Sequence, residues 1–200
     1  MKATFINSFL KTAAHEGGYV NDPSDRGGET YKGISRVMHP EWTGWDYIDV
    51  FKNKYSPDKM RMRMESHAGL QNLVEDLYKE KYWLVNKLYF FDQYIADELF
   101  DTGVNQGTKT AAKYLQRSLN KLNRNQKDYS DLRVDGNVGD RTITAYRAYM
   151  ATHRFSSRNE ELLIKWLLAV LNYYQLERYM RITDADLKQE KYIPGWLNRS

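Results

Sequence analysis

The sequence predicts a mainly α-helical protein with one small β-hairpin. Apolar residues recur at helical spacing in several stretches along the 200 residues. A glycine-rich strip at residues 17–35 carries turn signals and one short strand-like run, residues 29–34, and these predict the hairpin. Hydrophobic residues make up 42% of the chain, which is enough for a substantial core. We expect one domain, or two small domains packed together.

The first predicted helix ends beside a glutamate. Its apolar face consists of Phe5, Ile6, Phe9, Leu10 and Ala13. Gly17-Gly18 then stops the helix and leaves Glu16 near the free carbonyls of the last turn. This position disfavours the ionised carboxylate and tends to raise its pKa, which suits a general acid. The alternative is a solvated helix-end glutamate followed by glycines that only serve turns.

The strip after Glu16 contains more polar groups of the kind that hydrolysis requires. Asp22, Asp25 and Glu29 supply carboxylates, and Thr30 supplies a hydroxyl. Asp25 follows Glu16 by nine residues and Thr30 follows it by fourteen. A cleft with a protonated glutamate on one side and a second polar group on the other is an arrangement that breaks glycosidic bonds.

Two runs in this strip, 16–23 (Glu-Gly-Gly-Tyr-Val-Asn-Asp-Pro) and 25–34 (Asp-x-Gly-Gly-x-Thr-x-x-Gly-Ile), resemble a known signature. It is that of the glycoside hydrolase family 108 N-acetylmuramidases, which are lysozymes of bacteria and phages, some labelled "secretion activator protein". The resemblance implies a lysozyme-like fold with Glu16 as catalytic acid. By analogy with phage-type lysozymes, Asp25 and Thr30 would position the attacking water, although Thr30 lies one residue closer to Asp25 than is usual there. Tyr19 and Asp22 are candidate substrate-binding residues.

Aromatic residues follow directly after the hairpin. Trp42 and Trp45 lie in a loop-like stretch, and we consider them either one wall of a substrate groove or part of a packed loop. Further along, Ser56-Pro57 marks the start of a helix, with the serine as N-cap. The segment 101–107 is similar to one that helps to close the cleft of helical lysozymes. Asn105 in this segment is a candidate for binding an acetamido group, or a cap for the next helix.

The second half of the chain resembles helical peptidoglycan-binding domains. The resemblance lies in Leu115-Gln116-x-x-Leu119-Asn120 and in the run 135–145, Asp-Gly-x-Val-Gly-x-x-Thr-x-x-Ala. This pattern is specific for the fold, but less so for binding, because its glycines, aspartate and valine serve turns and packing. A buried helix is predicted over residues 160–180, and the ending Gly-Trp-Leu-Asn-Arg at 195–199 is common in the family. We therefore expect a catalytic domain at residues 1–100 and a peptidoglycan-binding-like domain at 101–200.

The charge and residue content of the chain limit the classes of partner and cofactor that we expect. The net charge is +4, and the charges of both signs are interspersed, which favours an anionic surface such as a cell wall over nucleic acid. Cysteine is absent, the four histidines lack metal-ligand spacing, and no metal or organic cofactor is implied. No apolar run is long enough to insert into a membrane. The first residues form no signal peptide, so we expect synthesis in the cytoplasm and access to the wall by a pore, a secretion system or lysis.

The function expected from these features is hydrolysis of the β-1,4 bond between N-acetylmuramic acid and N-acetylglucosamine in the glycan strands of peptidoglycan. The separation of Glu16 from the second catalytic group would decide between inversion and retention. A chitinase-like glycosidase and a non-catalytic wall-binding or secretion-associated protein are the alternatives.

Overall fold

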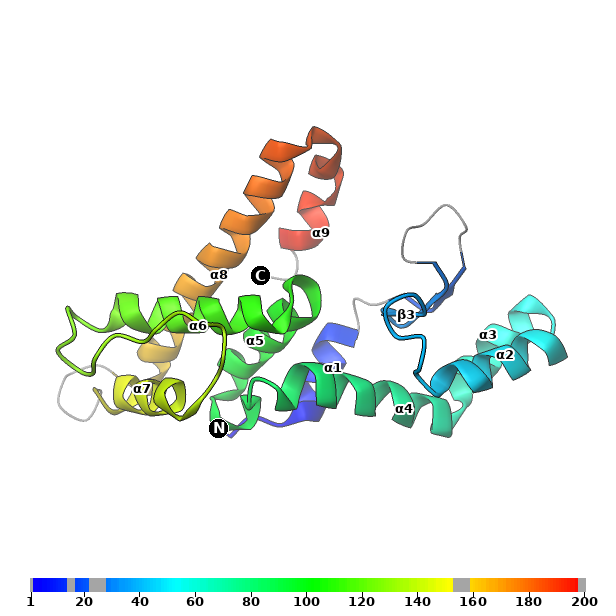
Figure 1. Cartoon of the computed structure of the whole chain (residues 1–200), viewed down its shortest axis with the longest axis horizontal. Helices are drawn as coiled ribbons and strands as arrows, with labels where there is room; N and C mark the ends of the chain where they lie inside the picture. The colour runs from blue at the N-terminus through cyan, green and yellow to red at the C-terminus, as the bar shows by residue number, and fades with distance from the viewer. Residues whose placement is uncertain (1, 14–16, 22–27, 153–158, 198–200) are drawn as a thin grey trace. The chain divides into compact units, whose positions relative to one another are not determined.

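The computed structural model describes residues 2–13, 17–21, 28–152 and 159–197. It divides into two compact units, which are described separately here. The small unit comprises Phe9–Glu80, and the large unit comprises Met1–Ser8 together with Lys81–Ser200. Most of the described residues are helical, as predicted (Figure 1). The domain boundary near residue 100 stays a prediction.

The small unit contains the sheet. Its strands are β1 (Tyr19–Val20), β2 (Thr30–Tyr31) and β3 (Ile34–Ser35), paired antiparallel in the order β1-β2-β3. The sheet therefore has three strands, where the sequence predicted a single hairpin. The third strand arises because Lys32 and Gly33 both adopt positive φ, 44° and 75°, as the tight type I′ hairpin turn requires.

Helices precede and follow this sheet along the chain of the small unit. The second half of α1 (Phe5–Ala13) precedes it, and α2 (Gly44–Lys54), α3 (Pro57–Ser66) and α4 (Ala68–Tyr78) follow it. Ser56 immediately precedes α3, and Pro57 is its first residue, so the predicted helix start is confirmed. The buried core of this unit is formed by Tyr31, Ile34, Ile48, Met64 and Leu70, none of which is more than 1% exposed.

The large unit is helical throughout its regular elements. It contains α5 (Gln93–Gln106), α6 (Thr108–Leu122), α7 (Asp140–Ala151), α8 (Glu160–Ala185) and α9 (Ile193–Leu197), with the 3₁₀ helices η2 (Leu88–Phe90) and η4 (Leu187–Tyr192). The turn η1 (Lys79–Leu84) leads into it from α4. Helices α5, α6 and α8 pack against one another, and α7 packs against α6 and α8.

Helix α8 shows how the apolar pattern is used. The structure extends it five residues beyond the predicted end, to Ala185. Its fully buried residues recur every four positions, as Leu163, Leu167, Leu171, Gln175, Tyr179 and Thr183. One stripe of the helix therefore faces the core, and the apolar residues on either side of it are half-buried. In the part of the chain that the structure describes, no helix is long and apolar enough to cross a membrane.

Candidate functional site

A pocket of about 430 Å³ opens in the small unit where α1 ends. Its apolar wall is formed by Phe9, Val74 and Tyr78, and its polar wall by Lys32, Glu65, Gln71 and Glu75. Ala13 and Gly17, the described residues on either side of 14–16, both line it. A concave site with one apolar and one hydrogen-bonding wall is typical of small-ligand pockets, and it suits a sugar ring, which has apolar faces and polar edges.

Lys32 organises the polar wall. The β2–β3 turn directs its ammonium group toward Glu65 Oε2, at 2.9 Å, and toward Gln71 Oε1, which accepts a hydrogen bond at 2.8 Å. The Gln71 amide nitrogen in turn donates to the Tyr31 hydroxyl at 2.9 Å and to the Met64 carbonyl at 2.6 Å. Burial raises the pKa of Tyr31 to about 12, so its hydroxyl stays protonated. The chain of contacts fixes the positions of the polar groups that a ligand would meet.

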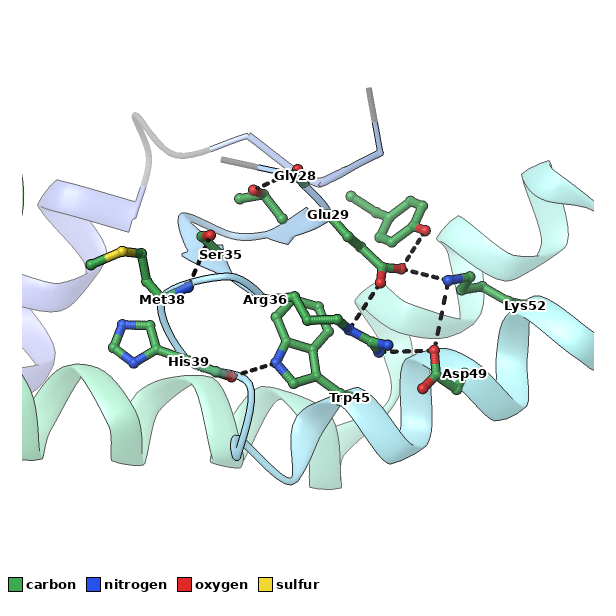
Figure 2. Close-up of polar contacts among 11 residues, drawn as sticks. Gly28, Glu29, Ser35, Arg36, Met38, His39, Trp45, Asp49 and Lys52 are labelled. Atoms are coloured by element: carbon green, nitrogen blue, oxygen red, sulfur yellow. Dashed lines mark hydrogen bonds and ion pairs between the residues drawn. The ribbon is translucent and has the colours of Figure 1, made fainter. Parts of the chain in front are cut away.

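A second polar cluster anchors the strand that follows residues 22–27. The Glu29 carboxylate accepts a hydrogen bond from the Tyr19 hydroxyl at 2.6 Å, and it pairs with Lys52 at 2.7 Å and with Arg36 at 2.9 Å (Figure 2). Arg36 also pairs with Asp49 at 2.8 Å. These partners come from β1, α2 and the segment after β3. The cluster therefore connects the sheet to α2 through Glu29. Glu29 therefore has a structural role here.

Two of the predicted site residues, Tyr19 and Thr30, lie in the strands beside this cluster. Tyr19 is half-buried, and burial followed by its hydrogen bond to Glu29 raises its pKa. Thr30 pairs with Val20 and Ser35 in the sheet, and its hydroxyl donates to the Gly28 carbonyl at 3.3 Å. Neighbouring residues of a strand point to opposite faces, so Thr30 and the buried Tyr31 face opposite ways. Glu16, Asp22 and Asp25 lie outside the described residues.

The two tryptophans are part of the core. Trp42 is 8% exposed and Trp45 is 4% exposed, and their rings meet edge to face with centroids 5.1 Å apart. Each indole N–H donates to a backbone carbonyl, that of Leu73 at 3.3 Å and that of His39 at 2.7 Å. Both rings are therefore packed inside the small unit, Trp45 from the first turn of α2, and their contact with substrate stays a prediction.

Asn105 lies in the large unit, near the end of α5. Its side chain is exposed, and its amide nitrogen donates to both the backbone carbonyl and the Oδ2 atom of Asp101, at 2.9 Å each. These bonds are made within one helix. The predicted capping role is not seen, because the residue that precedes α6 is Gly107. Contact of Asn105 with an acetamido group stays a prediction.

Sequence reasoning missed the polar wall of the pocket. Lys32 occupies a turn, and Glu65 and Gln71 lie on helices, where isolated polar residues carry no motif. Gly33 was the available signal, because glycine suits the positive φ of a tight hairpin turn, but residues 29–34 were predicted as one strand-like run. Within the described ranges, no group of three or more histidine, aspartate or glutamate side chains could hold a metal ion.

The comparisons with known proteins cover almost the whole chain. Residues 9–107 match the family model described as "Glycosyl hydrolase 108", and residues 110–200 match the model described as "Predicted Peptidoglycan domain". Among solved structures, the chain is similar to SagA of Brucella abortus, with 19% sequence identity and a TM-score of 0.55 over 98% of this chain and 88% of that one. At this identity the likeness concerns the fold alone. No curated protein matched the sequence.

Fold and pocket define a mainly helical, lysozyme-like protein with a small antiparallel sheet. The chain belongs to glycoside hydrolase family 108 and carries a peptidoglycan domain after its hydrolase segment. It is therefore a glycoside hydrolase whose domains indicate peptidoglycan as the substrate.

Proposed function

We propose that the protein is an N-acetylmuramidase that hydrolyses the β-1,4 bond between N-acetylmuramic acid and N-acetylglucosamine, with Glu16 as general acid. One observation carries this proposal. Ala13 and Gly17, which flank residues 14–16 in the sequence, both line the pocket at the end of α1. The described residues on either side of the segment that contains Glu16 thus line a cavity large enough for a sugar residue, and this supports the assignment of Glu16.

The polar wall supplies groups that would orient the substrate. Lys32 offers a hydrogen-bond donor, and Glu65 and Glu75 offer acceptors, so an N-acetyl sugar could be bound through its hydroxyls and its amide. Glu16 would protonate the glycosidic oxygen, and a water held by Asp25 and Thr30 would attack the anomeric carbon. For this role the Thr30 hydroxyl would exchange its bond to Gly28 for one to the water.

The test is digestion of purified peptidoglycan, with the products reduced and identified by mass spectrometry. A muramidase leaves muramic acid at the new reducing ends, whereas a glucosaminidase leaves glucosamine there. We expect muramic acid ends from the wild type and none from Glu16→Gln, a change that keeps the size of the side chain and removes its acid. Since a general acid contributes about 10²–10⁴-fold, the loss of rate should be at least about a hundredfold.

Chitin digested in parallel addresses the chitinase-like alternative. Cleavage of chitin at a rate equal to that of peptidoglycan would contradict the muramidase assignment. A wild type that releases no reducing ends from either polymer would favour the non-catalytic alternative. Sedimentation with purified cell walls then shows whether the Glu16→Gln protein still binds.

A further inference from the structure

The large unit has a groove of its own, which the proposed catalysis does not use. It lies between the segment 129–139 and the first turns of α7, and its volume is about 1010 Å³. We call it the α7 groove, and its lining includes Gln116, Asp131, Arg133, Asp135, Arg141 and Thr142. All of these residues belong to the peptidoglycan domain matched at 110–200.

Three side-chain amides hold the loop that forms this groove. The buried Gln116 donates to the Asn137 carbonyl at 3.0 Å and accepts from the Gly136 N–H at 2.9 Å. Asn120 makes the same pair of bonds to the backbone of Leu132, at 2.8 and 2.7 Å. Asn123 does so to Tyr129, at 2.6 and 3.1 Å. The groove is therefore pre-formed, so a ligand need not order the loop.

The charges in the groove are of two kinds. Asp135 accepts hydrogen bonds from Gln116 at 2.8 Å and from the Asn137 N–H at 2.9 Å, and these bonds lower its pKa. Asp131 accepts from Asn123 at 3.0 Å. Both carboxylates are thus used to build the loop. Neither Arg133 nor Arg141, both exposed, forms an ion pair with any residue in the described ranges.

Arg141 is the second residue of α7, which begins at Asp140, and Arg133 lines the same groove. The first N–H groups of a helix have no partner within the helix, and its dipole favours negative charge there. Two guanidinium groups and a helix start in one groove favour a ligand with carboxylates, which arginine binds through two parallel hydrogen bonds. Asp140 at the rim pairs with Lys87 at 3.7 Å, and its side chain is 99% exposed.

A neutral glycan fits the groove less well. Tyr129 is the one aromatic residue among the described lining residues, and its hydroxyl is bonded to the Leu119 carbonyl at 2.6 Å. The ring is half-buried, so only part of its surface is available to a sugar. The glycan backbone of peptidoglycan is largely neutral, whereas its short peptides carry carboxylates and amines. The groove therefore suits the peptides better than the glycan.

We propose that the α7 groove binds the peptide stems of peptidoglycan through their carboxylates, with Arg133 and Arg141 as the principal contacts. The proposal rests on the proposed function only for the identity of the wall polymer. It assigns the two parts of peptidoglycan to different units of the protein, with the glycan at the pocket of the small unit and the peptide in the α7 groove.

The test uses the full chain and isothermal titration with N-acetylmuramyl tripeptide that has free carboxylates. We expect saturable binding that weakens with added salt, and a loss of about tenfold or more for each of Arg133→Gln and Arg141→Gln. Lys121→Gln is the matched control, because it removes one exposed positive charge outside the groove and should leave the affinity unchanged. Circular dichroism checks that each variant is folded.

Three further probes separate the alternatives. The same muramyl tripeptide with its carboxylates amidated should bind at least about tenfold more weakly. Equal binding of the amidated probe, or unchanged affinity in the Arg133→Gln/Arg141→Gln double variant, would overturn the proposal. So would equal binding of inorganic phosphate, which would indicate a general anion site, or binding of neutral chitotetraose that the double variant abolishes. Because Glu16→Gln should keep the peptide affinity, a failure of the hydrolysis assay and a failure of this one are distinguishable.

Discussion

Glu98 is a buried acid whose replacement should make the protein more stable at neutral pH. It lies in α5 and is 8% exposed, and it accepts a hydrogen bond from Thr102 at 3.2 Å. In the flipped orientation of its side-chain amide, Asn172 of α8 donates a hydrogen bond to Glu98 Oε2, also at 3.2 Å. Burial, and then the nearby Asp101 and Asp97, raise the pKa of Glu98 to about 7.

The size of the effect follows from this pKa. Below pH 4.5 the carboxyl is protonated in both the folded and the unfolded chain, so its raised pKa in the folded protein costs no stability there. As the pH rises from 4.5 to 7, the unfolded chain releases the proton while the folded protein still holds it, and stability falls. The difference between a pKa of about 7 and the ordinary 4.5 corresponds to about 3 kcal/mol, at about 1.4 kcal/mol for each pKa unit.

Glu98→Gln removes this penalty, because glutamine is uncharged at every pH. The variant should therefore be more stable than the wild type by up to about 3 kcal/mol at pH 8 and equal to it at pH 4. Urea unfolding followed by tryptophan fluorescence at both pH values measures this difference. Glu190→Gln, at an exposed position, is the control and should change neither value. A Glu98→Gln protein less stable than the wild type at pH 8 would refute the reasoning.

Two further predictions concern the pocket at the end of α1. A Cβ atom on Gly17 would meet nothing within 4 Å, so Gly17→Ala should leave the melting temperature unchanged yet lower kcat/KM on peptidoglycan by about tenfold, if substrate approaches the backbone there. Gly195→Ala, equally open, is the control, and full activity of Gly17→Ala would place the substrate elsewhere. Lys32→Met removes a partly exposed ion pair worth at most about 1 kcal/mol. If kcat/KM falls by more than about tenfold while the free energy of unfolding changes by at most about 1 kcal/mol, Lys32 contacts the substrate.

The parts of the fold that depend on local rules could be predicted from the sequence. Ser56-Pro57 determines where α3 begins, because proline is favoured in the first turn of a helix and lacks only an N–H that would have no helical partner. The turn at Asp135-Gly136 was also predicted. Gly136 adopts a φ of +79°, and a Cβ atom there would lie 3.0 Å from the Lys109 carbonyl, so the glycine is required by both conformation and space.

The parts that depend on distant partners could not be predicted. Nothing local distinguishes a tryptophan that lines a groove from one that fills a core, and Trp42 is bonded to the carbonyl of Leu73, which lies 31 positions further along the chain. The polar wall of the pocket joins Lys32 to Gln71, residues 39 positions apart, without any motif. Of the predicted catalytic residues, only Thr30 lies among the described residues, so the roles of Glu16 and Asp25 stay predictions.

The amides of Gln116, Asn120 and Asn123 hold the loop beside α7 by its main chain. They act as neighbouring strands would in a sheet, although the loop itself has no regular secondary structure. Since these amides grip peptide groups, which every residue shares, substitutions along the loop can alter what the groove prefers without changing the path of the chain. The side chains that line the groove can thus change while the path of the loop is kept by the three amides.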